Sequence, residues 1–437
     1  MNFIKEGKWA KMNRINELVK EYCPDGVPFK KVKDVYTRLK GTPITAGKMK
    51  EIACDGGEIR IFAGGKTIID THEKDIPKAN ITRVPAVLVQ SRGVIDVLYY
   101  DKPFTFKNEM WAYTSDDVIS VKFLYYVLKN NIQIFRDAAS GMGSLPQISL
   151  KITEEFMIPV PPLEVQREIV HILDYFTLLT AELTAELTAR KKQYEFYRDE
   201  LLKPKNNVPM VTLKDIATDI YRGAGIRRDQ VTEEGMPCVR YGEIYTTYNT
   251  WFEECVSHTK LEFVPNPKYF EHGDILFAIT GESIEDIAKS VAYTGHEKCL
   301  AGGDIVVLKH KQNPRYLAHV LATQQAREQK SKGRVKSKVV HSNVPSIEQI
   351  TIPLPSLEVQ ERYADVLDNF EKICTDLNIG LPAEIEARQK QYEYYRDVLL
   401  TFAETGSTLL TDRQTDRQTD RQTDRQTDRQ TDRAERN

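Results

Sequence analysis

The chain has 437 residues, of which 41% are hydrophobic, so it is long enough for roughly two or three globular domains with buried cores. Lys and Arg number 61 against 63 Asp and Glu, and the formal net charge of −2 excludes a polycation that coats nucleic acid through bulk charge. The apolar stretches are too short for a membrane span, residues 1–20 lack the apolar core of a secretion signal, and the six cysteines form no C-x-x-C pair. These features predict a soluble, cytoplasmic protein with free thiols.

In chain order, an opening helix is expected over residues 15–22, followed by a first variable region with one short helix at 123–128. A second variable region, later in the chain, has one short helix at 316–325. Short β-rich apolar runs bounded by turn residues predict the strands of both regions. These runs are 59–62, 84–89, 273–279 and 304–308. The two regions are therefore expected to be mixed α/β domains.

Three blocks of sequence occur twice, which indicates a tandem duplication and predicts a pseudo-two-fold molecule. The paired blocks are Ile158–Gln166 with Ile352–Gln360, Ala189–Leu202 with Ala387–Leu400 and, more faintly, Val27–Val35 with Val208–Ile216. The first pair reads I-P-V-P-P-L-E-V-Q and I-P-L-P-S-L-E-V-Q. A helix is expected to begin directly after each Pro-rich stretch, because proline is tolerated in a first helical turn.

Apolar residues at spacings of three, four and seven predict a helix from Leu163 to Lys203, roughly 60 Å long at about 1.5 Å per residue. The second copy has a similar stripe, which Gly380–Pro382 is expected to break or kink before Ala383 restarts the helix. The alternative for each stripe alone is an ordinary core helix, but two matching stripes favour an antiparallel coiled coil. The residues selected as spacer or partner-docking positions are Leu163, Leu183, Leu187, Tyr194, Tyr197, Leu357, Tyr392 and Tyr395.

The chain resembles the specificity subunits of type I restriction-modification enzymes, to about residue 402. The resemblance rests on the paired P-x-L-E-V-Q helix starts, the tandem T-A-E-L pair at Thr180–Leu187 and the segment Cys23–Val27. It implies two target-recognition domains that each read half of a bipartite, asymmetric DNA site, held apart by the long helices. The implied partners are double-stranded DNA, two modification (methyltransferase) subunits and, in the full complex, two restriction (translocase-nuclease) subunits, for adenine methylation or DNA cleavage.

The expected organisation has six segments. They are an N-terminal helix (1–24), a first recognition domain (25–157), a central spacer helix (158–203), a second recognition domain (204–351), a C-terminal spacer helix (352–403) and a tail (404–437). Because the resemblance begins near Met12, both Met1 and Met12 stand as candidate start residues.

Basic residues crowd one stretch of the first variable region and two of the second, as expected for side chains that position DNA phosphates. The candidates are Lys30, Lys31, Lys33, Arg38, Lys40 and Lys48, then Arg222, Arg227 and Arg228, then Lys332, Arg334 and Lys336. The alternative is a solvated charged surface. The duplicated placement gives the two interpretations about equal weight.

Loops that follow buried strands supply candidates for reading bases. Arg pairs well with guanine and Glu accepts from the cytosine amino group, so different residues at equivalent places would read different half-sites. Plain turns are the alternative. A second pair of loops is expected at Ser140–Gln147 in the first variable region and at Lys332–Ser337 in the second, which are interpreted as equivalent. The candidates are Ser91, Arg92 and Gly93 with Thr280 and Glu282, and Gly141 with Gln147.

Motifs for catalysis are incomplete. Asn266–Tyr269 interrupts the adenine-methyltransferase pattern with a lysine, and Gly64–Thr67 lacks the first glycine of a P-loop because Arg60 stands there. No histidine or cysteine cluster has metal-site spacing. The prediction is a non-catalytic subunit with no metal and no cofactor. The alternatives are a self-contained DNA methyltransferase or nuclease, and a coiled-coil adaptor without a DNA role.

The C-terminal tail repeats Thr-Asp-Arg-Gln five times from Thr411, a low-complexity composition that predicts disorder. The codons ACA-GAC-AGA-CAG encode this unit and are three copies of one tetranucleotide. We therefore hypothesise a slippage-prone, phase-variable tract. A neutral solvated tail is the alternative.

Overall fold

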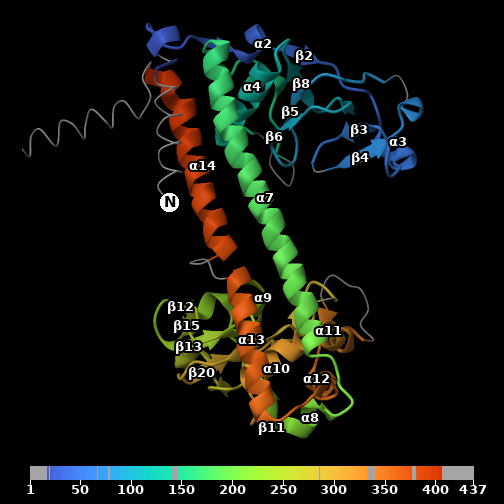
Figure 1. Cartoon of the computed structure of the whole chain (residues 1–437), viewed down its shortest axis with the longest axis vertical. Helices are drawn as coiled ribbons and strands as arrows, with labels where there is room; N and C mark the ends of the chain where they lie inside the picture. Colours follow the sequence, from blue (N-terminus) through green and yellow to red (C-terminus); the bar gives the residue numbers. More distant parts are fainter. Residues whose placement is uncertain are drawn as a thin grey trace, which may run out of the picture. The chain divides into compact units, whose positions relative to one another are not determined.

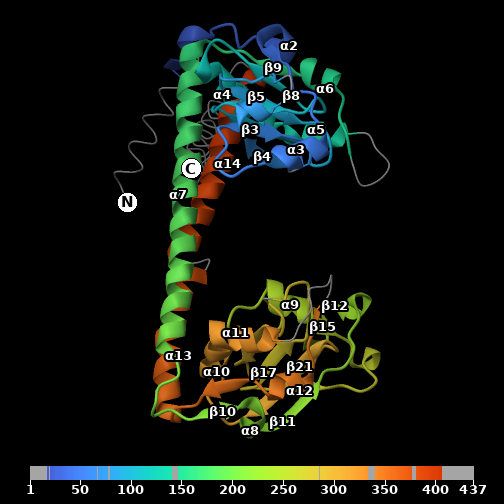
Figure 2. The same ribbon diagram turned by 90° about the vertical axis from the view of Figure 1, so that its right-hand side faces the viewer.

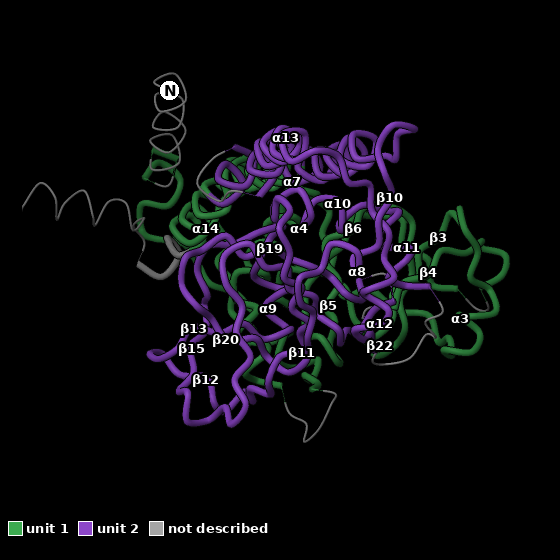
Figure 3. Tube along the Cα trace, turned by 90° about the horizontal axis from the view of Figure 1, so that it is seen from below, with its two compact units in different colours: residues 1–181, 387–437 green, residues 182–386 purple. Residues whose placement is uncertain are grey.

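The computed structural model describes residues 17–405 except 19, 66, 77–78, 140–145, 285, 333–339 and 376–379. The chain divides into two compact units, drawn in different colours in Figure 3. Unit 1 is residues 1–181 with 387–437, and unit 2 is residues 182–386. Helices α7 (Leu163–Leu201) and α14 (Gly380–Thr405) each contribute to both units (Figure 1).

Unit 1 contains two main sheets. The antiparallel four-stranded sheet has the order β2-β8-β5-β6 (Thr37–Leu39, Trp111–Thr114, Ala86–Gln90, Asp96–Tyr100), and the three-stranded sheet has the order β4-β3-β7 (Ile68–Thr71, Ile59–Phe62, Phe104–Phe106). The remaining elements before α7 are β1 (Phe29–Lys31), α2 (Val32–Val35), α3 (Ala46–Ile52), η1 (Glu73–Asp75), α4 (Val118–Asn130), α5 (Ile132–Asp137), α6 (Leu150–Glu154) and β9 (Met157–Pro159).

Unit 2 contains two five-stranded sheets. Their orders are β11-β21-β17-β19-β14 (Ala217–Arg222, Ile305–His310, Ile275–Ala278, Ser290–Tyr293, Trp251–Phe252) and β12-β15-β13-β20-β16 (Val231–Thr232, Ser257–Thr259, Met236–Val239, Cys299–Ala301, Tyr269–Phe270). The two-stranded pairs are β10-β23 (Met210–Thr212, Thr351–Pro353) and β18-β22 (Thr280–Gly281, Val340–His341). The helices are α8 (Leu213–Ile216), η2 (Arg228–Gln230), α9 (Tyr241–Thr246), η3 (Leu261–Phe263), α10 (Pro314–Leu321), α11 (Gln324–Ser331), α12 (Val344–Glu348) and α13 (Leu357–Thr375).

The duplication extends into the variable regions, where the sequence similarity has faded. The order β2-β8-β5-β6 in unit 1 corresponds to β11-β21-β17-β19 in unit 2. The second sheet of each unit also contains a parallel pair, β3 with β7 and β13 with β20. Strand pairing depends on the pattern of buried positions and not on residue identity, so the fold is retained while the sequences diverge.

The repeated Pro-rich blocks have the same structural role in both units. Each block forms a strand that pairs antiparallel with the similar strand upstream, β9 with β1 and β23 with β10. The glutamine that ends each block, Gln166 or Gln360, is buried and donates its side-chain N–H to the carbonyl of its block's second proline, at 2.7 Å and 2.8 Å. The motif therefore joins the edge of a recognition domain to the start of a long helix.

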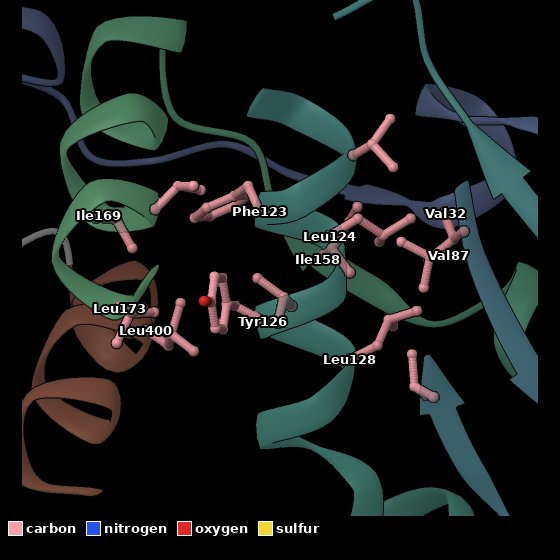
Figure 4. Packing of buried hydrophobic residues seen from close by; sticks show 14 of the residues in the cluster. Val32, Val87, Phe123, Leu124, Tyr126, Leu128, Ile158, Ile169, Leu173 and Leu400 are labelled. Atoms are coloured by element: carbon pink, nitrogen blue, oxygen red, sulfur yellow. The ribbon is translucent and has the colours of Figure 1, made fainter. Parts of the chain in front are cut away.

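In unit 1, α4 lies between the four-stranded sheet and the long helices. Figure 4 shows Ile169 and Leu173 of α7 and Leu400 of α14 facing Phe123 and Tyr126 of α4. All five side chains are buried. In unit 2, α10 takes the corresponding place, with α13 on one side and strands β17 and β19 on the other.

The long helices of each unit, α7 and α14 in unit 1 and α7 and α13 in unit 2, lie side by side and run in opposite directions (Figures 1 and 2). In unit 1 the rings of Phe176 on α7 and Tyr395 on α14 stack with centroids 5.1 Å apart. In unit 2 the rings of Tyr197 on α7 and Phe370 on α13 lie 6.4 Å apart. The predicted antiparallel arrangement of long helices is confirmed.

The predicted helix breaks differ from the observed ones in detail. Helix α14 begins at Gly380 and not at Ala383, because Pro382 falls in the first turn, where no N–H is needed. Gly380 itself adopts φ +67°, a conformation that favours glycine where the chain turns into the helix. The prediction of one helix over 316–325 is wrong. The chain forms α10 and α11 instead, since the Thr323 hydroxyl accepts from the Ala326 N–H and starts a new helix.

Three further predictions concern the opening helix, membrane-spanning segments and the C-terminal tail. Within the opening segment, residues 17–18 and 20–22 are helical. None of the helices in the described ranges is long and apolar enough to cross a membrane. The Thr-Asp-Arg-Gln tail lies outside the described residues.

Candidate nucleic-acid interface

In unit 1, a loop after β5 brings together two of the residues predicted to read bases. Arg92 forms an isolated antiparallel bridge with Gln147, and the Ile148 N–H donates to the Ser91 carbonyl at 2.9 Å. Gly93 adopts φ +80°, a conformation that favours glycine. The side chains of Arg92 and Gln147 are exposed, so this loop presents two adjacent polar groups to solvent.

In unit 2, the loop after β17 is built in the same way. Thr280 pairs with His341, and the Ser342 N–H donates to the Ile279 carbonyl at 2.8 Å. The Thr280 hydroxyl lies 3.2 Å from the His341 ring Nδ1. Thr280 and His341 thus occupy the positions that the Arg-Gln pair occupies in unit 1. Glu282 follows in the same loop and is exposed.

The comparison of Ser140–Gln147 with Lys332–Ser337 is corrected by this geometry, because the residue of unit 2 that is structurally equivalent to Gln147 is His341. His341 follows Gln147 by 194 residues, the offset that also relates the Pro-rich blocks. That offset was the signal that could have identified His341. Lys332 is exposed after α11, whereas the other candidates of these loops lie outside the described residues. These are Gly141, Arg334 and Lys336.

The basic stretch of unit 1 is largely paired with carboxylates inside its own domain. The pairs are Lys31 and Lys33 with Glu155, Arg38 with Glu154, and Lys48 with Glu51. Hydrogen bonds from the two lysines hold the pKa of Glu155 at about 2. Lys30 and Lys40 are exposed, with no ion pair to any described residue. Much of the predicted positive charge is therefore neutralised locally.

In unit 2 the arginines that surround the glycines after β11 are exposed. Arg222 donates to Asp304 at 2.6 Å, and Arg227 lies 3.4 Å from Asp229. Arg228 begins η2. Arg222 is therefore tied to the turn before β21, while the other two side chains extend toward solvent.

A cavity of about 450 Å³ beside β2 and β8 brings two predicted residues together with two that the sequence did not reveal, Asn108 and Trp111. Arg38, Lys40, Asn108 and Trp111 line it. The Trp111 indole N–H is buried and has no hydrogen-bond partner among the described residues. A buried donor without an acceptor is costly, and the neighbouring cations also donate, so the cavity suits an acceptor such as a base edge or a phosphate oxygen.

A largely buried carboxylate in unit 2, that of Asp368, connects α10 with α13. Asp368 accepts from His319 Nε2 at 2.7 Å, from Trp251 Nε1 at 2.9 Å and from an Arg315 guanidinium N–H at 2.6 Å. Burial alone would raise the pKa of Asp368, but these three donors outweigh it and hold the pKa below its ordinary value. Asp368 therefore anchors the recognition domain to the long helix as an anion.

The same anchor occurs in unit 1. Asp174 of α7 accepts from Lys122 Nζ at 2.5 Å and from the Tyr126 hydroxyl at 2.7 Å. Asp174 precedes Asp368 by the block offset of 194, and both lie in the sequence Leu-Asp-x-Phe. This repeated tetrapeptide is the sequence signal that points to both residues, neither of which is among the predicted site residues.

Within the described ranges, one group of side chains is close enough to hold a metal ion: His319, Asp368 and Glu371. Their ligand atoms already have protein partners. The Tyr194 hydroxyl lies 3.1 Å from His319 Nδ1, and Glu371 accepts from the Thr250 hydroxyl at 2.5 Å. The group is therefore a hydrogen-bond network that fastens α10 to the helices.

The predicted spacer residues fall into two classes. Tyr197 and Leu357 are exposed, at 48% and 57%. The other six are half-buried, and Tyr194, Tyr392 and Tyr395 among them pack against the core of their own unit. These six are Leu163, Leu183, Leu187, Tyr194, Tyr392 and Tyr395.

Both halves of the chain match one family model, described as the type I restriction modification DNA specificity domain, over residues 24–190 and 205–387. The chain belongs to the type I restriction-modification specificity subunits. Subunits of this family confer DNA sequence specificity and are not catalytic, so a self-contained methyltransferase or nuclease and an adaptor without a DNA role are both rejected.

Known specificity subunits are similar to this one in sequence and in fold. The Type I restriction enzyme EcoR124I/EcoR124II specificity subunit of Escherichia coli is 31% identical over 306 residues, covering 66% of this chain and 72% of the relative. The crystal structure of the type I S subunit from M. genitalium has a TM-score of 0.50 at 16% identity, covering 86% of this chain and 96% of that one. A chain from work on complex assembly and conformational transition of the type I R-M system has a TM-score of 0.51 at 14% identity.

Proposed function

We propose that this specificity subunit reads a bipartite, asymmetric DNA site, one half with the recognition domain of each unit. The support is the pair of equivalent loops. The same bridge and the same backbone hydrogen bond present Arg92 and Gln147 in unit 1 but Thr280 and His341 in unit 2. Equivalent positions with different donors and acceptors would read different base edges.

The predicted phosphate-positioning residues form the second part of this proposal. Lys30, Lys40, Arg227 and Arg228 are exposed and so accessible to a DNA backbone. We propose the lysines and arginines already paired with carboxylates, such as Lys31 and Arg38, as secondary contacts. DNA would have to compete with these internal ion pairs.

The proposed partners are modification and restriction subunits, in the bacterial cytoplasm. Helices of both units carry exposed apolar side chains, which mark protein interfaces when they are clustered. Phe196 on α7 is 62% exposed, and Tyr394 on α14, at the equivalent repeat position, is 41% exposed. Further exposed apolar side chains lie on the helices of unit 1 (Tyr175, Leu178) and of unit 2 (Tyr197, Phe370, Ile373), and one such set in each unit supports two modification subunits per chain.

Helix α7 is proposed as the spacer that sets the distance between half-sites. It is continuous for 39 residues, and the division between the units falls after Ala181, inside the T-A-E-L pair. A repeat copy inserted there would lengthen one unbroken helix.

Methylation mapping tests the two-loop proposal. The subunit is reconstituted with its modification subunit, and methylated adenines are mapped for the double variants Arg92→Ala/Gln147→Ala and Thr280→Ala/His341→Ala. Each variant should relax one half-site and leave the other unchanged, with about 10–100-fold lower discrimination, because a good base contact is worth about 1–3 kcal/mol.

The matched control is Arg83→Ala, an exposed arginine of unit 1 that is paired with Glu73. It should leave both half-sites intact. Relaxation of both half-sites by one double variant, or of neither half-site by either, would contradict the proposal.

A further inference from the structure

A cavity of about 580 Å³ lies within unit 2, between helices α7 and α13 and the recognition domain. This volume falls in the range of about 300–1,000 Å³ that is usual for ligand pockets. Five of its lining side chains are cationic and three are anionic. The cationic residues are Lys191, Arg198, Lys289, Arg327 and Lys330.

Lys330 and Arg198 are the most buried of these cations, at 6% and 4% exposure. The Lys330 ammonium donates to the Leu321 carbonyl at 2.8 Å and to the Ser290 hydroxyl at 3.2 Å, and it lies 5.6 Å from the centre of the Phe277 ring. All of these partners are uncharged. Burial, together with the positive charge of Arg327 and Arg198, lowers the pKa of Lys330 to about 7.

Lys289 also lines the cavity and is half-buried. Its ammonium lies 3.5 Å from the Tyr245 carbonyl and 3.4 Å from the Tyr248 carbonyl, and burial lowers the pKa of Lys289. Neither Lys289 nor Lys330 has a carboxylate within ion-pair distance among the described residues.

The two arginines of the cavity differ from the two lysines. Arg198 donates to Asp199 at 2.9 Å, and Arg327 lies 3.8 Å from Glu195. Asp286 and Glu371 favour the charged form of Lys289 without forming an ion pair with it, whereas none of the described carboxylates offsets the charge of Lys330.

Burying an ammonium without a counter-charge is strongly unfavourable, and neutral acceptors offset only part of the cost. The Leu321 carbonyl ends α10 and adds a partial negative charge. Capping contacts with the ends of α10 and α9 account for the polar partners of Lys330 and Lys289. They do not account for the open space that both lysines share or for the excess of cations around it, whereas an anion in the cavity accounts for both.

We propose that this cavity is a phosphate-binding site, in which Lys289 and Lys330 hold a phosphate group. Tyr194, Tyr245 and Tyr248 also line the cavity, and aromatic residues suit the organic part of a nucleotide-sized ligand. A free organic phosphate and a backbone phosphate of bound DNA share this chemistry. Only the DNA source rests on the proposed function.

Thermal unfolding of the full-length protein tests the site. Sodium pyrophosphate and ATP are titrated separately at an ionic strength held constant with sodium chloride. The variants are Lys330→Met and Lys289→Met, and the control is Lys214→Met, an exposed lysine of α8. For a free phosphate, wild type and control should show a saturable rise in Tm. The affinity should fall at least tenfold in Lys289→Met, and the effect should be absent in Lys330→Met.

Folding failure does not confuse this result, because replacing an unpaired buried ammonium by methionine should leave the ligand-free Tm equal to or above that of wild type. If neither small phosphate raises the Tm, the source is DNA, and duplex binding is measured against salt. The slope of log K against log salt should then fall by about one in Lys289→Met and stay unchanged in Lys214→Met. A Tm rise that persists in both cavity variants, or no Tm rise together with an unchanged salt slope, overturns the proposal.

Discussion

Replacing Asp368 by asparagine should loosen the attachment of α10 to α13 in unit 2. The side chain is 14% exposed and accepts from three donors, one of them on the fully buried His319. Asparagine keeps the volume but loses the charge and turns an N–H toward one of the donors. Hydrogen bonds to charged groups contribute about 1.5–3 kcal/mol each, so we expect a loss of about 2–4 kcal/mol.

The matched control is Asp365→Asn on the same helix. Asp365 also pairs with Arg315, at 3.0 Å, but it is 57% exposed, and exposed ion pairs contribute about 0–1 kcal/mol. In unit 1, Asp174→Asn should have an intermediate effect, since Asp174 is 39% exposed.

Amide hydrogen exchange of the full-length protein measures these effects locally. Asp368→Asn should lower the protection of α10 and leave that of α4 unchanged, whereas Asp174→Asn should do the reverse. Because the pKa of Asp368 is depressed in the folded state, its contribution is present above the unfolded value near 4 and is lost as the pH falls below that value. Equal effects of Asp368→Asn and Asp365→Asn would refute the reasoning.

Three further outcomes are expected. Adding one T-A-E-L copy to Thr180–Leu187 adds about 6 Å of helix, and a base pair rises about 3.4 Å. Methylation mapping should therefore show a gap between the half-sites that is longer by one or two base pairs, with both half-site sequences kept. An unaltered gap would contradict the spacer role. Leu173→Ala should lower the free energy of unfolding by about 2–5 kcal/mol, measured by chemical denaturation, because Leu173 is fully buried. Phe196→Ala should leave the stability unchanged and weaken co-elution with the modification subunit, because Phe196 is exposed. The opposite pattern would disprove the assignment of Leu173 to the core and of Phe196 to the partner interface. Lys330→Met should stabilise unit 2 by up to about 5 kcal/mol at pH 6, and this gain should shrink as the pH rises from about 7 to about 10.5. The cost of burying the charged lysine is greatest below its pKa in the folded state and disappears once the lysine is neutral in the unfolded chain as well. A difference in stability that does not change with pH would contradict the buried charge.

The amino-acid sequence predicted only part of the candidate DNA-reading site. Arg92 and Thr280 were selected from their places after buried strands, and the structure puts both in equivalent bridges. Their partners are 55 and 61 residues further along the chain. Gln147 was selected on a different comparison and His341 was missed, since residue type and local pattern carry no information about which loops meet.

The amino-acid sequence by itself determined the duplication, the long helices and the break between α13 and α14. Each of these depends on local periodicity, on proline and glycine, or on a constant offset between blocks. Tertiary structure alone decided the burial of Lys330, the unpaired indole of Trp111 and the convergence of His319, Trp251 and Arg315 on Asp368. These depend on contacts between segments that are distant in the chain, where the cost of burying charge is set by neighbours that no local pattern specifies.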